Sequence, residues 1–434
     1  MSQLLTTKFV AKSLAATVSV LMLSTVANAA TAEQSQIQQL RQEVETLKAL
    51  IQQQQQVQLQ QASQIEQVKA APAQSAFAGL KSKAGANVNI YGFVRADAQY
   101  KIEGADGIFS AIDKVDLGNG TAVGGGIVKN PNKDRFYATA KTTRLGLDFK
   151  APVQGADVGG KIEVDFAGSG SNNDGSLRIR HAYLTYNNWL VGQTTSNFLS
   201  GATVPEMIDF SSPLGIGTKR TPMVRYSDKI NTNATYAVAL EKGADANRLP
   251  AATAKVDYKF DQGVVNARAL LQEVRARRVD ATSTPADPKE YNDKEKFGWG
   301  LAVGASVKPV DALSLNVDYS HVKGDNFYLG YTSSNDAYVV DGNDINLAEF
   351  DAVTVGATYQ FAPKLRSTLG YGAVFFDKDT ASNNKKLQQA WLNVLYSPVK
   401  PLTFGAEYVY GKRDTVTNLS GKENHVGLMA KYDF

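Results

Sequence analysis

Apolar and polar residues alternate along most of the chain, from residue 87 to the last residue. The segment 313–319, for example, reads Leu-Ser-Leu-Asn-Val-Asp-Tyr, and comparable segments of about ten residues recur between clusters of turn residues. A period of two indicates a β-strand with one apolar and one polar face, whereas an amphipathic helix would repeat about every 3.6 residues. The pattern predicts sixteen strands, at residues 87–100, 135–150, 157–167, 177–187, 188–197, 221–229, 232–242, 251–260, 263–276, 295–308, 312–323, 348–361, 365–377, 385–397, 402–413 and 423–434.

The connections between these strands alternate between short turns and mostly longer polar loops. Residues 187–188 and 261–262 are two-residue turns, whereas residues 101–134 and 324–347 are long loops. Short turns at one end and long loops at the other are typical of outer-membrane barrels, whose turns face the periplasm. The predicted fold class is therefore an all-β, 16-stranded antiparallel transmembrane β-barrel, closed so that no strand edge lacks a partner in lipid. A soluble β-sandwich is the alternative, but it does not explain apolar outward faces with aromatic rims together with charged inward faces.

The final strand also fits an outer-membrane barrel. Every second residue from Val426 to Phe434 is apolar, so the chain ends with an aromatic residue on the apolar face. Exported bacterial barrels typically end in such a strand, which their assembly machinery reads. We therefore expect the chain in the bacterial outer membrane, in contact with lipid and lipopolysaccharide.

The first 86 residues differ in composition and predict three further segments. Residues 1–29 are typical of a signal peptide, because a basic start precedes a short apolar run and a small-residue cleavage pattern. Residues 30–70 keep a heptad register and predict a short N-terminal α-helical coiled coil in the periplasm. Residues 71–86 form a linker, and residues 87–434 form the barrel. An uncleaved membrane anchor and a disordered Gln-rich tether are the respective alternatives to the first two segments.

Composition excludes several other functions. The chain has 46 Lys and Arg against 42 Asp and Glu, so it lacks the basic excess of a nucleic-acid binder. It has no cysteine, which excludes disulfides and thiolate metal sites, and its three histidines have no neighbouring catalytic triad. The sequence therefore predicts no enzyme, no catalytic residue, no cofactor and no metal site. The segment from Asp341 to Asp344 faintly resembles a calcium loop and is interpreted as a turn.

The polar faces of the strands carry more charge than a dry core can hold, so the barrel is predicted to enclose water. Arginines gather on the first six strands, which should form one wall. Arginine keeps its charge and its planar fork suits carboxylates, so this wall predicts a preference for small anions. The alternative for any single arginine is a structural pair with a lumen acid. The candidate channel-lining residues are Arg95, Arg144, Arg178, Arg180, Lys219, Arg220, Arg225 and Arg268.

The third long connection, residues 198–220, is the candidate constriction. It contains Pro205, Glu206 and Asp209 among apolar stretches, and apolar residues in a long loop favour packing inside the wall. Three glycines between residues 298 and 304 would leave room for it on the lumen side of one strand. A flap on the outer surface is the alternative.

Local motifs resemble one known family. Ile-Arg-His-Ala-Tyr-Leu at 179–184 precedes Val-Gly-Gln-Thr at 191–194, and Arg-x-Pro-x-Val-Arg-Tyr follows at 220–226. Together with the coiled coil and the sixteen strands, these motifs resemble the DcaP-like porins of Acinetobacter-type bacteria over nearly the whole mature chain. The resemblance implies a homotrimeric channel for small anionic solutes, especially dicarboxylates such as phthalate or succinate, and for anionic β-lactam-type compounds.

Arg180, Arg220 and Arg225 lie inside the resembling segments, whereas Arg95, Arg144, Arg178 and Arg268 rest on strand parity alone. A general or sugar-selective porin is the first alternative, although the inward aromatics form no ladder for sugar stacking. An outer-membrane enzyme and a structural or adhesin barrel are further alternatives. The coiled coil is expected to stabilise the trimer or to contact peptidoglycan.

Overall fold

The computed structural model describes Glu45 and residues 80–434, apart from 84, 169–174, 218, 280–281, 329–336 and 378–382. The chain divides into two compact units, Met1–Ala76 and Phe77–Phe434, and only the second is described below. The predicted signal peptide and coiled coil lie outside the described residues, as does most of the linker, so they stay predictions. Among the described residues, no helix is both long enough and apolar enough to cross a bilayer.

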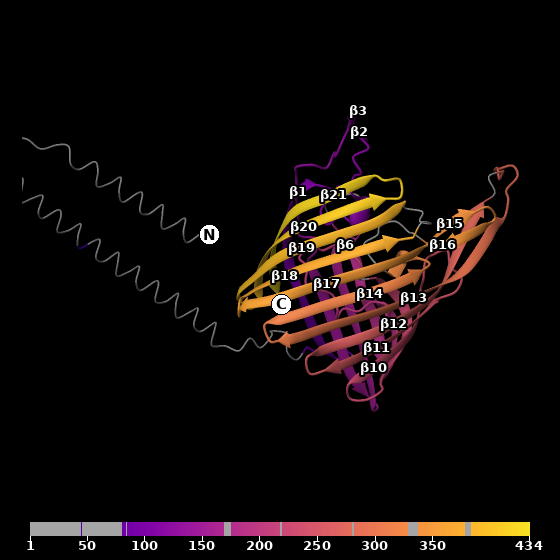
Figure 1. The fold of residues 1–434 in the computed structure, drawn as a ribbon. Helices are drawn as coiled ribbons and strands as arrows, with labels where there is room; N and C mark the ends of the chain where they lie inside the picture. The colour runs from indigo at the N-terminus through magenta and orange to yellow at the C-terminus, as the bar shows by residue number, and fades with distance from the viewer. Residues whose placement is uncertain are drawn as a thin grey trace, which may run out of the picture. The chain divides into compact units, whose positions relative to one another are not determined.

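Antiparallel pairing runs from strand to strand along the second unit until the last strand returns to the first (Figure 1). β1 pairs with β21 on one edge and with both β4 and β5 on the other, so β4 and β5 form one interrupted barrel strand. Counted in this way, the ring is the predicted closed, antiparallel barrel of sixteen strands. The ring strands are β1 (Asn87–Glu103), β4 (Arg135–Thr139), β5 (Arg144–Val153), β6 (Ala156–Gly168), β7 (Ser176–Tyr186), β8 (Trp189–Thr195), β9 (Arg220–Lys229), β10 (Ala234–Glu241), β11 (Ala251–Phe260), β12 (Gly263–Val279), β13 (Tyr291–Val310), β14 (Leu313–Lys323), β17 (Glu349–Ala362), β18 (Leu365–Phe376), β19 (Asn384–Val399), β20 (Leu402–Thr415) and β21 (Ser420–Asp433).

The loop end carries the remaining short elements. These are η1 (Ile112–Lys114), β2 (Thr121–Val123), β3 (Gly126–Val128), η2 (Asn326–Tyr328), β15 (Tyr338–Asp341) and β16 (Asp344–Leu347). The connections used below are L1 (residues 104–134), L3 (196–219), L4 (242–250), L5 (280–290) and L6 (324–348). Asp341 and Asp344 face each other across a two-residue turn between β15 and β16, so this segment is the turn that the sequence predicts.

The strand ends differ from the prediction in two instructive places. β12 and β13 pair with each other as far as Val279 and Tyr291, beyond their other neighbours, which lengthens both strands at the loop end. The strand predicted at 135–150 is interrupted at residues 140–143. There Thr142 leaves the ladder and donates its hydroxyl to a carboxylate oxygen of Asp97 at 2.7 Å.

Alternate side chains of the ring strands face outward and are apolar, as a membrane-spanning barrel requires. On β13, Phe297, Leu301 and Val303 are all more than half exposed in the isolated chain. Aromatic side chains gather near the turns, where the rings of Trp189 and Tyr226 lie 5.0 Å apart. Amphipathic rings at this level suit the boundary between lipid and water.

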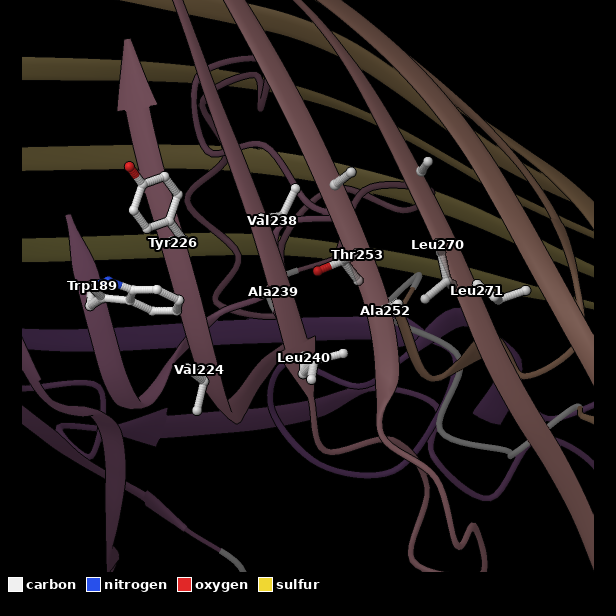
Figure 2. Close-up of a pocket in the computed structure, with 12 residues that line it drawn as sticks. Trp189, Val224, Tyr226, Val238, Ala239, Leu240, Ala252, Thr253, Leu270 and Leu271 are labelled. Carbon is white, nitrogen blue, oxygen red and sulfur yellow. The ribbon is translucent and has the colours of Figure 1, made fainter.

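The outer face of β8 to β12 has a shallow hollow of about 540 Å³ (Figure 2). Leu240 on β10 and Leu271 on β12 project on either side of Ala252, which stands between them in the strand register. The small alanine leaves the depression, and exposed apolar side chains surround it. This hollow faces the membrane, so a charged solute finds no partner there, and the chemistry of the protein lies in the lumen.

Candidate functional site: the lumen

L3 folds into the barrel and follows the inner wall. Near its start, the Phe198 carbonyl accepts a hydrogen bond from Arg268 Nη1 at 3.1 Å. The Thr203 hydroxyl donates to an oxygen of Asp318 at 2.6 Å, and Arg268 and Asp318 are themselves paired at 2.6 Å. The first part of L3 is therefore fixed to β12 and β14.

The middle of L3 is fixed by Glu206. Its carboxylate takes two hydrogen bonds from Arg366 on β18, both of 2.7 Å. Its carbonyl accepts from Trp391 Nε1 at 3.0 Å and from Asn393 Nδ2 at 3.1 Å, both on β19. The two parallel bonds between Arg366 and the Glu206 carboxylate are charge-assisted and belong to the strong class of hydrogen bond.

The tip of L3 is held by a buried cluster of charges. The backbone N–H groups of Ile208 and Asp209 donate to Glu407 on β20 at 2.8 and 2.7 Å. The Asp209 carboxylate lies 3.0 Å from His425 Nε2 on β21, and Arg95 donates to the Ile208 carbonyl. Burial alone would raise the pKa of Asp209, but its hydrogen bonds to His425 and Ser211 outweigh burial and lower it.

Small residues on the wall make room for this loop. Of the three glycines predicted to do so, two lie beneath L3 on β13. A methyl group at Gly300 would stand 2.8 Å from the Phe198 ring, and one at Gly304 would stand 2.9 Å from Thr203. Gly298 instead packs against the backbone of β14. L3 thus covers the wall from β12 round to β1, as an inward fold of the loop requires.

The wall of β5, β6 and β7 carries a continuous network of arginines and acids. Arg178 binds Asp165 through two hydrogen bonds, of 2.9 and 2.7 Å. Arg180 bridges Asp165 and Glu163, both at 2.7 Å, and Arg144 approaches Glu163 at 3.3 Å. Three cations against two carboxylates leave this network with a charge of 3 − 2 = +1.

Several guanidinium nitrogens in this region have no acid partner in the described part of the chain. Arg178 uses Nε and Nη2 for Asp165, and Arg180 uses Nε and Nη1 for its two acids. Each therefore keeps one terminal nitrogen without an acid among the described residues. Arg225 on β9 forms no ion pair there, and its buried Nε has no hydrogen-bond partner.

The structure separates the eight basic candidates into three groups. Arg144, Arg178, Arg180 and Arg225 lie on the wall of β5 to β9, where Arg180 is 9 % exposed and lies against Phe210 of L3. Lys219 and Arg220 lie at the neck of the loop. Arg95 binds Asp97 at 2.7 Å and is 8 % exposed, because it supports the L3 tip.

Arg268 differs from the expectation that it lines the open channel. It is 3 % exposed and lies behind L3, where its pair with Asp318 anchors the loop. Pro205, Glu206 and Asp209 all lie in the inward loop, but the two acids face the covered wall.

Sequence reasoning did not single out Phe210, and it placed the two acids of the network, Glu163 and Asp165, in the lumen without naming them as site residues. The Phe210 ring lies 5.6 Å from the guanidinium carbon of Arg95 and 5.9 Å from that of Arg180, within cation–π range. Phe210 therefore joins the L3 tip to the arginine wall. The indication available in the sequence was that Phe210 directly follows Asp209, a candidate residue of the constriction loop. Glu163 and Asp165 share strand parity with the arginines, which indicates the lumen but not the pairing.

Comparison with known proteins agrees with this architecture. Residues 18–434 match the model of the DcaP outer membrane protein family. The crystal structure of the outer-membrane channel DcaP of Acinetobacter baumannii is 50 % identical, with 82 % of this chain and 99 % of that chain covered and a TM-score of 0.72. No match was found among curated proteins.

A more distant structure shares the fold alone. The anion-selective porin from Comamonas acidovorans is 11 % identical, with 80 % of this chain and 100 % of that chain covered and a TM-score of 0.51. The match to the family model, the sequence identity to the Acinetobacter baumannii channel and the closed barrel with a charged lumen lead to one conclusion. This chain belongs to the DcaP outer-membrane protein family and is an outer-membrane channel rather than an enzyme.

Proposed function

We propose that this channel lets small anionic solutes, dicarboxylates in particular, diffuse passively across the outer membrane. The observation that carries the proposal is the orientation of charge around L3. Glu206 and Asp209 are paired with the covered wall, so they do not offset the arginines across the lumen. The space between L3 and the wall of β5 to β9 is then bordered by an excess of positive charge, which favours anions.

The spacing of two arginines supports a preference for dicarboxylates. Arg178 and Arg180 lie on β7 at a register irregularity against β6, and both donate to the same oxygen of Asp165, so their guanidinium groups lie close together. Each has a terminal nitrogen without an acid among the described residues. A small dicarboxylate can engage both at once, and Arg225 offers the next cation further along the wall. Binding at each step must stay weak, because the solute has to leave.

The proposal is tested by current block in planar bilayers. Succinate should reduce the current carried by chloride, and Arg180→Ala and Arg225→Ala should weaken this block more than they lower salt conductance. Asn316→Ala is the matched control, because Asn316 lines the lumen on β14 and bonds only Ser306 among the described residues. Equal losses of block and conductance would contradict a specific site and would favour a general porin.

The proposed assembly is a homotrimer, stabilised by barrel contacts and by the predicted coiled coil at residues 30–70. Family resemblance supports it, and contact of the coiled coil with peptidoglycan is the alternative role.

A further inference from the structure

A second loop packs against the inner wall of the barrel beside the tip of L3. L1 is longer than L3, L4, L5 or L6, and its residues 105–116 lie against β20 and β21. A methyl group added at Gly411 of β20 would collide with Ile112, and one added at Gly421 of β21 would collide with the backbone of Asp116. Ile112 is itself 2 % exposed, so small residues on the wall make room for L1 as they do for L3.

The turn at residues 105–110 of L1 is fixed by a buried ion pair. Lys101 on β1 and Glu423 on β21 are paired at 2.9 Å, and both side chains are almost completely buried. Lys101 Nζ also donates to the Ala105 carbonyl at 2.7 Å and to the Ser110 hydroxyl at 3.0 Å. The Ala105 N–H donates to Glu423 at 2.9 Å. Buried polar networks of this kind rigidify the segment that they bind, so the turn keeps one position against β1 and β21.

Phe109 in this turn has a strained backbone. Its φ is 58°, in the left-handed region that is sterically unfavourable for a bulky residue. Glycine takes up this region at little cost, and Gly107 does so two residues earlier with a φ of 84°. Strain of this kind persists only where the surrounding contacts over-determine it, and it clusters at functional sites. The strain therefore indicates that the direction of the Phe109 ring has a purpose.

The Phe109 ring lies against the tip of L3. The ring centroids of Phe109 and Phe210 are 6.0 Å apart and their planes are tilted by 50°, which is the range of an aromatic contact. Gln99 on β1 joins the same two loops, because its Oε1 accepts the Phe109 N–H at 3.4 Å and its Nε2 donates to Asp209 at 3.3 Å. Phe210 thus contacts Phe109 as well as the guanidinium groups of Arg95 and Arg180.

We propose that Phe109 is a positioning residue of the constriction. L1 braces the Phe210 ring against Arg95 and Arg180 through Phe109, so that L1 and L3 together set the width and the steadiness of the opening. The inference goes beyond the proposed function, because it concerns the shape of the opening whatever solute passes through it.

The test is single-channel recording in potassium chloride without any organic anion, so its outcome is independent of the dicarboxylate proposal. An aromatic contact favours the braced arrangement about two- to tenfold. Phe109→Ala should raise the population of the displaced Phe210 ring by this factor, and current noise and mean conductance should increase. Phe109→Tyr keeps the ring and should behave as wild type. Ile127→Ala is the matched control, because Ile127 lies in the same loop on β3 and is 75 % exposed.

Two further variants separate positioning from a purely structural role. Phe109→Gly suits the left-handed backbone, so it should unfold at a higher temperature than Phe109→Ala and still show the raised noise and conductance. It also covers the case in which the alanine variant does not fold. In a Phe210→Ala channel, Phe109→Ala should add no further change, because the partner ring is already gone. Wild-type noise and conductance in a folded Phe109→Gly channel, or additive effects in the double variant, would overturn the inference.

Discussion

Glu407→Ala is expected to free the tip of L3 while the rest of the loop stays attached. Glu407 is 3 % exposed and accepts the backbone N–H groups of Ile208 and Asp209 as well as Asn393 Nδ2. Alanine removes all three acceptor contacts. The anchor at Thr203 and the pair of Glu206 with Arg366 do not involve Glu407. Asn393 Nδ2 bonds both Glu407 and the Glu206 carbonyl, so the perturbation reaches no further than the tip and this one shared contact.

The magnitude follows from the two buried backbone donors. Each buried donor without a partner costs about 1 to 3 kcal/mol, which gives about 2 to 6 kcal/mol for the pair. Water that enters the space left by the side chain brings the value toward the lower end. A loss of about 2 kcal/mol multiplies the population of the detached tip about 30-fold.

Single-channel recording reads this population directly. Glu407→Ala should show more current noise and a higher mean conductance than wild type, because the tip no longer holds Phe210 against the arginine wall. Asn316→Ala again serves as the control. A folded Glu407→Ala barrel with wild-type conductance and noise would refute the assignment of Glu407 as an anchor of the constriction.

Three further predictions follow from the same contacts. Glu163→Gln should raise the anion-to-cation permeability ratio measured from reversal potentials, because the network charge changes from +1 to +2; a lower ratio would contradict the proposed field. The pKa of Asp209 is lowered in the folded chain, so its contribution to loop anchoring is complete above its unfolded pKa of about 3.9 and is lost as the pH falls through the folded value. Current noise should therefore be higher below about pH 4 than at pH 5, whereas Asp209→Asn should already be noisy at pH 5 and show no such rise; the same rise in both would exclude this residue. Deletion of residues 31–72 should lower the temperature at which the trimer dissociates on gels, and an unchanged temperature would refute a stabilising coiled coil.

Strand positions were predictable because the barrel imposes a strict local rule. Each ring strand has one face toward lipid and one toward water, so a period of two appears in the sequence wherever a strand crosses. The prediction weakens where this constraint ends. β12 and β13 extend past the membrane band, and Thr142 breaks a strand to reach Asp97, which is far away in the sequence.

The alternation of side chains along the strands predicted which charged residues face the lumen, but it did not predict which residues they bind. Alternation placed Arg180 and Arg268 inside the barrel equally well. The fold of L3 decides which of them is covered, and that depends on Asp318, Arg366 and Glu407 on strands far along the chain. The local sequence indicates the direction of a side chain on its strand, but it does not indicate against which part of the wall a loop packs.

The sign of the ion selectivity tests the central claim most directly. The reversal potential of the reconstituted wild-type channel is measured under a tenfold gradient of potassium chloride. The account predicts a potential of the sign that chloride permeation sets, because the acids of L3 are paired with the covered wall and the arginines border the opening. A potential of the opposite sign, or one close to zero, would contradict it.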